Sequence, residues 1–243
     1  MKNIIIWIRS ILFFIAFYLW SATVLIFFAW TLLLTKRMVI HSAEVWCKGV
    51  RVLLRWIANI KVEIKGMENL PKKNGYIIAS KHQSAMETML FHSFLPSTIY
   101  VMKKSLFFIP LGGLYFWRSG CIAIDRKKGT SSLRKMFVQA KDRLSKGFNI
   151  IIFPEGTRTA PGAEPKYNSG LAMIYEAVNV PVIPTALNTG YFWPKNSMMR
   201  YPGTVTIEFL PAIEPGLEKR QFMKTLQDRI ENAIVDPNKP LTK

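Results

Sequence analysis

The chain has few cysteines, few histidines and few acidic residues, and each shortage excludes a class of protein. Its two cysteines, Cys47 and Cys121, lie far apart and form no Cys-x-x-Cys pair, so we expect neither a disulfide framework nor a redox motif. With three histidines, and with cysteines that lack metal-ligand spacing, no zinc site can be built from the usual motifs. No short-period repeat or low-complexity segment is visible.

The acidic residues are outnumbered by the basic ones. There are 15 Asp and Glu residues against 33 Lys and Arg residues, which gives a formal net charge of +18. Such a balance indicates an anionic partner, which could be nucleic acid, an acidic membrane face, or a phosphorylated ligand or carrier. No recognised nucleic-acid-binding motif is present, so we expect no nucleic-acid partner. A length of 243 residues, half of them apolar, fits one domain with appendages.

A long uncharged run lies near the N-terminus. Ile11 to Leu34 comprises 24 residues without a charge, and a helix that spans a bilayer needs about 20 apolar residues. No Ala-x-Ala site follows before Lys36 and Arg37, which disfavours a cleaved signal peptide. The run is apolar on every side, which makes a buried helix of a soluble domain the weaker alternative.

The next segment, Met38 to Ile60, mixes apolar residues with cations such as Lys48, Arg51 and Arg55. It predicts an amphipathic helix that either lies on an anionic leaflet or packs its apolar face on a core. More cations follow the uncharged run than precede it, so a spanning helix would leave the rest of the chain in the cytoplasm. A hairpin inserted into one leaflet fits equally well. We therefore assign residues 1–60 to membrane association, at the cytoplasmic face of the inner (cell) membrane.

From about Lys61 the composition changes to short β-branched runs that alternate with helical patterns. This alternation predicts an α/β fold for residues 61–243, with a single, mostly parallel sheet flanked by helices. The expected strands are Val62–Ile64, Tyr76–Ser80, Thr98–Val101, Ile122–Ile124, Asn149–Phe153, Val182–Leu187 and Thr204–Phe209. The expected helices are Ser84–Phe94, Ser131–Lys146, Ser169–Val178 and Glu218–Val235.

A histidine and a carboxylate follow the expected strand Tyr76–Ser80, at the edge of the sheet where parallel α/β proteins bind ligands. His82 can accept a proton from a hydroxyl group near neutral pH. Glu87 could orient it, provided that His82 lies in the turn before the helix, because on one continuous helix the two would lie about 140° apart. Alternatively, with Ser84 as N-cap, Glu87 only caps the helix.

A second polar segment follows the expected strand Asn149–Phe153. Gly156 admits a positive φ angle or the close approach of a ligand. Arg158 offers fork-shaped donors to a phosphate group, and Thr157 adds a hydroxyl group. Glu155 could receive a substrate hydroxyl group or fix the arginine. The alternative is an ordinary polar loop with an internal pair between Glu155 and Arg158.

Two further segments carry weaker signals. The strand that ends at Ile124 is followed by Asp125 and Arg126, and Arg126 is a second candidate for phosphate contact, unless it belongs to a solvated charge run. The segment Val180 to Pro184 is apolar with two prolines, which indicates an edge or entrance strand.

Four segments in this order resemble the glycerolipid acyltransferase family. Their order and spacing are most similar to those of the bacterial 1-acyl-glycerol-3-phosphate (lysophosphatidate) acyltransferases. The first segment has Glu87 where that family usually has aspartate, at unchanged spacing from the histidine. The segments are His82-x4-Glu87, Gly120 to Arg126, Phe153 to Arg158, and Val180 to Pro184.

The resemblance implies a reaction and roles for residues. His82 would be the general base that takes the proton from the glycerol 2-hydroxyl as its oxygen attacks an acyl thioester, and Glu87 would orient it. Arg126 and the turn Glu155 to Arg158 would hold the phosphate end of lysophosphatidate, and Val180 to Pro184 would line the acyl path. The donor would be acyl-CoA or acyl carrier protein, the product would be phosphatidate for phospholipid biosynthesis, and no bound cofactor or metal would be needed.

Two alternatives remain. The same chemistry could act on another acceptor, such as glycerol 3-phosphate or a lyso-aminolipid. A non-catalytic, cationic membrane-binding protein would explain the charge. It would not explain why His82 and Glu87 accompany the segment Glu155 to Arg158.

Overall fold

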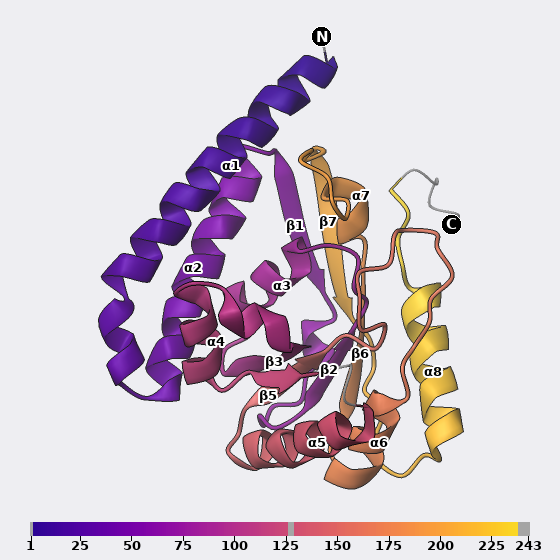
Figure 1. Ribbon diagram of the computed structural model, residues 1–243. Helices are drawn as coiled ribbons and strands as arrows, with labels where there is room; N and C mark the ends of the chain where they lie inside the picture. The colour runs from indigo at the N-terminus through magenta and orange to yellow at the C-terminus, as the bar shows by residue number, and fades with distance from the viewer. Residues whose placement is uncertain (1, 126–128, 238–243) are drawn as a thin grey trace.

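The computed structural model describes residues 2–125 and 129–237, and its seven strands form one sheet in the order β1-β7-β6-β2-β5-β3-β4. Of its paired strands, β6 and β7 alone run antiparallel. A single, mostly parallel sheet flanked by helices is therefore confirmed (Figure 1). The strands are β1 Ile60–Lys65, β2 Ile77–Ser80, β3 Thr98–Lys103, β4 Ile122–Ile124, β5 Asn149–Ile152, β6 Val182–Leu187 and β7 Gly203–Phe209.

The central strands β2, β5 and β6 are buried at every position. Strands covered on both faces read as continuous apolar runs, and successive side chains alternate between the two faces. Ile78 and Ile151 accordingly belong to one core cluster, whereas Ile77 and Ile150 belong to the other. The sheet therefore separates two hydrophobic layers.

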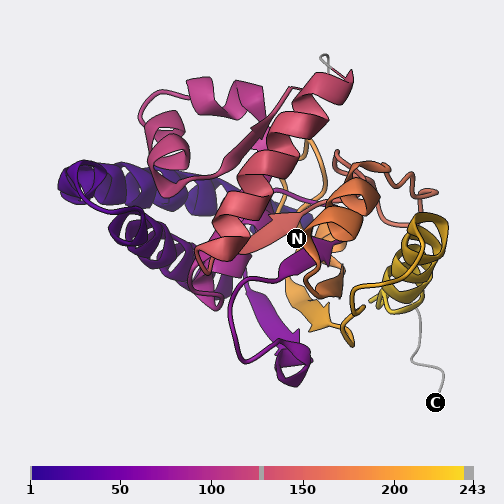
Figure 2. The same ribbon diagram turned by 90° about the horizontal axis from the view of Figure 1, so that it is seen from below.

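Different helices cover the two faces. The layer that contains Ile78 includes residues of α1 Lys2–Phe27, α2 Lys36–Trp56 and α3 Met86–Leu90. The other layer is covered by α5 Gly129–Ser145, α6 Gly170–Val178 and α8 Lys219–Asn232. Figure 2 shows α1 and α2 on one side of the molecule and α8 on the opposite side. The short 3-10 helices are η1 Ala29–Leu33, η2 Met67–Asn69, η3 Phe91–Ser93 and η4 Lys104–Phe108.

The N-terminal helix is long and apolar enough to cross a membrane: the most apolar window within Asn3–Phe27 has a mean hydropathy of 2.2, and only 17% of that window is buried. It runs beside α2 (Figure 1), where Trp20 Nε1 donates to Trp46 O at 2.9 Å and Trp46 Nε1 donates to Ser21 Oγ at 2.9 Å. Ile8 and Leu19 are among its many exposed apolar side chains. An apolar surface of this kind points to association with a membrane.

The boundary between residues 60 and 61 stays a prediction. Phe13 of α1 and Leu54 of α2 share one core cluster with Ile60 and Met86 of the α/β part. The N-terminal helices and the sheet are therefore packed against each other through a common hydrophobic layer.

All seven expected strands are present, and most differences lie at the ends of elements. The helix expected at Ser84–Phe94 is shorter: α3 covers Met86–Leu90, and a 3-10 turn follows it. Helix α4, Gly112–Ser119, was not expected because its sequence begins with two glycines, which are poor helix formers. Gly113 is needed there, since a Cβ atom at this position would lie 2.0 Å from the carbonyl oxygen of Phe107. The other unexpected helix is α7, Thr189–Phe192.

Val180 to Pro184 was predicted to be an edge or entrance strand, and the edge position was wrong. Strand β6 lies inside the sheet, between β7 and β2. Proline is tolerated at position 184 because the ladder with β7 begins only at Thr185, and the Pro184 carbonyl still accepts from Leu210 N at 2.9 Å.

Candidate active site

The two polar segments singled out in the sequence meet at one edge of the sheet. Strands β2 and β5 are parallel neighbours, so the residues after Ser80 and after Ile152 emerge side by side. The His82 ring stacks on the Phe153 ring, with centroids 4.1 Å apart and an interplanar angle of 21°. The loop after β5 also forms hydrogen bonds with the backbone of His82. His82 N donates to Glu155 Oε2 at 2.9 Å, and His82 O accepts from Thr159 N at 2.8 Å.

The carboxylate of Glu87 holds the imidazole of His82. Nδ1 of His82 lies 2.8 Å from Oε1 of Glu87, whose side chain is fully buried. The same oxygen accepts from Gln83 N and Ser84 N, each at 2.8 Å, and Oε2 accepts from Thr189 Oγ1 at 2.7 Å. An ionised carboxylate only accepts, so Nδ1 carries the proton and Nε2 keeps its lone pair. A neutral imidazole in this tautomer can accept a proton at Nε2.

The local chain explains why His82 and Glu87 meet. His82 precedes helix α3, which begins at Met86, and Ser84 Oγ accepts from Met86 N at 3.1 Å. Glu87, in the first turn, reaches back over Gln83 and Ser84 toward the ring. The sequence suggested that Glu87 either caps the start of the helix or orients His82. Its carboxylate makes both kinds of contact.

The turn after β5 leaves one guanidinium group without a partner. Gly156 has a φ of +66°, and its N–H closes the turn on Phe153 O at 2.9 Å, a conformation that favours glycine. No ion pair forms between Glu155 and Arg158, so the alternative of an internal pair is excluded. Within residues 2–125 and 129–237, the Arg158 guanidinium has no hydrogen bond or ion pair, and Thr157 is exposed. This turn can therefore offer donors to an anion.

Glu155 is buried and engaged on both oxygens. Oε1 lies 2.5 Å from Lys81 Nζ, and Oε2 accepts from the backbone of His82. Burial raises the pKa of Glu155, against the opposing effects of Lys81 and the His82 N–H. Asn168 Nδ2 fixes the loop by donating to Pro154 O and Glu155 O, each at 3.0 Å. A contact between Glu155 and a substrate stays a prediction.

The sequence did not indicate several partners of these residues. Thr189 comes from α7, an element that was not expected. Glu231 lies 150 positions beyond Lys81 and its Oε1 is 2.7 Å from Lys81 Nζ. Tyr167 OH donates to the same oxygen at 2.8 Å. Lys81 was visible as the residue before His82, but nothing in the sequence pairs it with residues so far away.

Two other predictions are left without a structural test. Arg126 lies outside the described residues. Val182 and Ile183 are fully buried in the sheet core, and their part in an acyl path stays a prediction.

An apolar cavity of about 200 Å³ lies between the N-terminal helices, β3 and α4. Tyr100 lines it, and the Tyr100 ring stacks 6.3 Å from that of Phe153, which also stacks on the His82 ring. His92 also lines the cavity, and burial lowers its pKa to about 4, so it is neutral. The rings of Tyr100 and Phe153 therefore connect the cavity wall to the histidine held by Glu87, which does not itself line the cavity.

Within the described ranges, no group of three or more His, Cys, Asp or Glu side chains is placed to hold a metal ion. The two cysteines both line the apolar cavity, and burial raises the pKa of each thiol. Thiols in such surroundings are poor nucleophiles. His82 is thus the described side chain best placed for proton transfer in this site.

The chain is similar in sequence to known acyltransferases. A model of the acyltransferase family matches residues 61–188. The 1-acyl-sn-glycerol-3-phosphate acyltransferase of Pseudomonas aeruginosa is 35% identical over 186 residues, which cover 76% of this chain and 72% of that protein. The enzyme of the same name from Borreliella burgdorferi is 29% identical over 185 residues, with 74% of each chain covered.

The fold also matches a solved structure. The crystal structure of PlsC, the 1-acyl-sn-glycerophosphate acyltransferase of Thermotoga maritima, superposes with a TM-score of 0.80 at 22% identity and covers 97% of this chain and 99% of that one. At this identity the likeness concerns the fold. The family match includes both His82 and the turn at Arg158, and the chain belongs to the acyltransferase family.

Proposed function

We propose that this protein transfers a fatty acyl chain from an acyl thioester to the 2-hydroxyl of 1-acyl-glycerol 3-phosphate, which gives phosphatidate. The observation that carries the proposal is the contact between His82 Nδ1 and Glu87 Oε1, which leaves Nε2 as a proton acceptor beside the turn that holds Arg158. The relatives from Pseudomonas aeruginosa and Borreliella burgdorferi are named for this acceptor, which supports its choice.

The reaction needs one base that later acts as an acid. Nε2 of His82 takes the proton of the acceptor hydroxyl as its oxygen attacks the thioester carbonyl carbon. The buried carboxylate of Glu87 stabilises the imidazolium that forms. When the tetrahedral intermediate collapses, the carbon–sulfur bond breaks, the ester forms, and the thiolate receives the proton. No acyl-enzyme is required.

The acceptor is held by its phosphate group. The Arg158 guanidinium has no hydrogen bond or ion pair with the described residues, and a guanidinium binds a phosphate group by two parallel hydrogen bonds. Thr157 adds a backbone N–H and a hydroxyl group from the same turn, and Gly156, whose own N–H donates to Phe153 O, allows the phosphate to approach closely. We assign Arg126 to the same phosphate from the family resemblance.

An acyl chain enters the apolar cavity lined by Tyr100 and Thr88. Thr88 follows Glu87 in α3, and Tyr100 is linked to His82 through the Phe153 ring. The cavity wall is predominantly apolar, as a hydrocarbon chain requires.

The N-terminal helices hold the enzyme at an anionic membrane. Helix α2 runs beside α1 and carries Lys48, Arg51 and Arg55, so a membrane-spanning α1 would draw these charges toward the hydrocarbon at high cost. Insertion of the apolar face of α1 into one leaflet avoids this cost. We place the enzyme on the cytoplasmic leaflet, where anionic lipids attract cationic segments.

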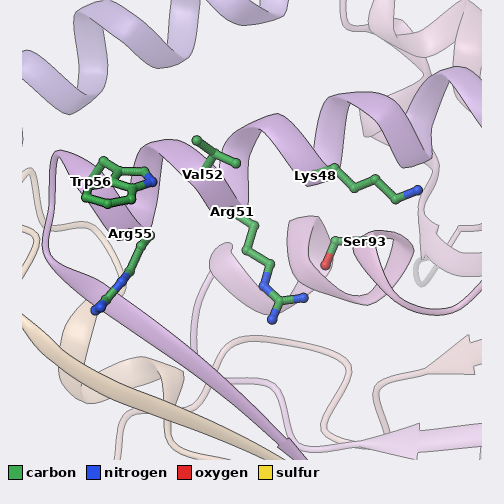
Figure 3. Close-up of a pocket in the computed structure, with 6 residues that line it drawn as sticks. All are labelled: Lys48, Arg51, Val52, Arg55, Trp56 and Ser93. Atoms are coloured by element: carbon green, nitrogen blue, oxygen red, sulfur yellow. The ribbon is translucent and has the colours of Figure 1, made fainter.

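A groove on α2 fits an anionic headgroup. It has a volume of about 330 Å³ and is lined by Lys48, Arg51 and Arg55 together with Trp56 and Ser93. Figure 3 shows the Arg51 and Arg55 side chains extending from α2 toward the side on which Ser93 lies. These three cations have no hydrogen bond or ion pair with the described residues, and Trp56 is 79% exposed, as suits the membrane interface. None of the lining residues belongs to the site at His82.

The acyl donor is acyl-CoA or acyl carrier protein, and no bound cofactor is needed. Both donors are acidic, which agrees with a net charge of +18. A thioester-release assay with purified enzyme tests the whole proposal. It offers lysophosphatidate, glycerol 3-phosphate and a lyso-aminolipid as acceptors, with each donor in turn. We expect thiol release and phosphatidate with lysophosphatidate. Turnover with another acceptor alone would reassign the substrate, and a protein that consumes no thioester with any acceptor would be a non-catalytic membrane binder.

A further inference from the structure

Lys81, the residue before the proposed base, has a side chain that is only 2% exposed. Its ammonium group lies between two carboxylates, 2.5 Å from Glu155 Oε1 and 2.7 Å from Glu231 Oε1. A buried ammonium group is rare unless acids surround it, because desolvation penalises the charge. Lys81 has no role in the mechanism proposed above.

The alternation of the strand explains why Lys81 and His82 point to different layers. Lys81 N donates to Thr185 O at 3.0 Å, so the pairing of β2 with β6 continues to this residue. Successive side chains of an extended strand point to opposite faces. Ile77 and Ala79 belong to the core layer covered by α8, and Lys81 continues that series. His82 continues the series of Ile78 and lies on the side of α3.

Lys81 reaches His82 through Glu155. One oxygen of this carboxylate faces the ammonium group, and the other accepts from His82 N at 2.9 Å. The position of the ammonium group therefore sets the position of the acceptor that holds the backbone of the base. Because the His82 carbonyl is bound by Thr159 N, the residue is fixed on both sides by the loop after β5.

The outer half of the cluster comes from the last helix. Glu231 lies in the last turn of α8, and its Oε1 accepts from Tyr167 OH at 2.8 Å while it faces Lys81. The cluster thus contains one cation and two carboxylates, and Lys81 screens the two acids from each other. Helix α8 and the base belong to one chain of contacts: Glu231, Lys81, Glu155, His82.

We propose that Lys81 and Glu231 are positioning residues, which connect α8 to the loop after β5 and thereby hold His82 against Glu87 in its catalytic orientation. The proposal rests on the proposed function, since it assumes that His82 is the base. Neither residue contacts the substrate.

The test compares Lys81→Met, Glu231→Gln and Tyr167→Phe by kcat, KM and the pH profile of kcat/KM, in vesicles that contain lysophosphatidate. Misplacement of a catalytic group by about 1 Å costs on the order of 10²-fold in rate. We expect Lys81→Met to lower kcat by about 10- to 100-fold, with KM values for both substrates changed less than about threefold. Glu231→Gln and Tyr167→Phe keep part of the cluster, so we expect a loss of kcat below about tenfold.

The acid limb of the pH profile separates positioning from mere stability. Loss of the Lys81 cation favours the protonated form of His82, so the acid limb should move to higher pH. Loss of the Glu231 anion disfavours that form, so the limb should move to lower pH. A residue that only stabilises the fold would leave the limb where it is in every variant that folds.

Lys219→Met is the matched control, because Lys219 also lies on α8 and pairs with Glu176 at 2.7 Å, but on the surface. Its kcat and pH profile should equal those of the unchanged enzyme. If Lys81→Met fails to fold, the kcat values and pH profiles of Glu231→Gln and Tyr167→Phe still test the proposal. Folded variants with unchanged kcat and an unmoved acid limb would overturn the inference alone. An unchanged enzyme without thioester turnover would instead refute the proposed function.

Discussion

Oε1 of Glu87 accepts three hydrogen bonds, from the Nδ1 of His82 and from the N–H groups of Gln83 and Ser84, each at 2.8 Å. Three donors on one buried oxygen leave the carboxylate little freedom to turn, so the imidazole can adopt only one orientation and one tautomer. A glutamate can make this contact at the position where the family usually has aspartate, because it reaches back from the first turn of α3.

Glu87→Gln should lower kcat by about 10²- to 10⁴-fold, because the imidazolium loses its counter-charge and the ring can adopt the wrong tautomer. KM values should stay nearly unchanged, since Glu87 is buried and cannot contact the substrates. Steady-state thioester release measures both. Glu68→Gln, on the exposed turn η2, is the control with the same change of charge. A kcat within threefold of the unchanged enzyme would mean that Glu87 only caps the chain.

Arg158→Ala should raise KM for lysophosphatidate by about 10- to 100-fold, because a hydrogen bond to a charged group contributes about 1.5–3 kcal/mol. The KM for the acyl donor should change much less. Arg220→Ala removes an exposed arginine of α8 and should leave both values unchanged. An unaltered KM for lysophosphatidate in the Arg158 variant would rule out its contact with the phosphate.

Replacing the three cations of the α2 groove should weaken binding to vesicles of phosphatidylglycerol in phosphatidylcholine by up to about 100-fold, since each cation near an anionic surface contributes about 1 kcal/mol. The variant carries Lys48→Gln, Arg51→Gln and Arg55→Gln, and co-sedimentation at two salt concentrations measures binding. Arg134→Gln, Lys141→Gln and Lys224→Gln remove three exposed cations of α5 and α8 as a control. If both triple variants lost the same amount of vesicle affinity, binding would depend on the net charge of the protein and not on the α2 groove.

His92 should make the fold sensitive to acid. Burial lowers its pKa from 6.5 to about 4, so the folded protein resists a proton that the unfolded chain accepts. Above about pH 6.5, His92 is neutral in both states and does not reduce the stability of the fold. As the pH falls from 6.5 toward 4, the unfolded chain binds the proton first, and the free energy of unfolding falls by about 3 kcal/mol. Denaturant unfolding in detergent between pH 4 and 7 measures it. His92→Phe should flatten the dependence, and His41→Gln, which removes an exposed histidine, should not. Equal slopes in all three proteins would contradict the burial of His92.

The fold could be predicted from the sequence because its strands are short apolar runs between clear helical patterns, as in Asn149–Ile152 and Gly170–Val178. Helix α4 was not predicted because packing against Phe107 requires the glycine at position 113, which no local pattern reveals. Strand β6 was predicted with the correct bounds, but its place in the sheet was wrong, because the effect of Pro184 depends on where the ladder with β7 begins.

The sequence predicted that the two polar segments share one site, but it predicted individual contacts only between residues near one another in the chain. His82 and Glu87 are five positions apart, so their contact is a question of local geometry. The hydrogen bond from His82 N to Glu155 joins residues 73 positions apart, and the contact between Lys81 and Glu231 joins residues 150 positions apart. Such pairs arise from the order of strands in the sheet, which the sequence alone did not determine.

The rate of thioester release by His82→Ala tests the central claim most directly. The variant keeps Glu87 and the turn at Arg158, and it should bind vesicles like the unchanged enzyme. We predict that release with lysophosphatidate falls by at least about 10²-fold, because the acceptor hydroxyl loses its base. Release within a few-fold of the unchanged rate, in a variant that binds vesicles normally, would contradict the assignment of His82 as the general base.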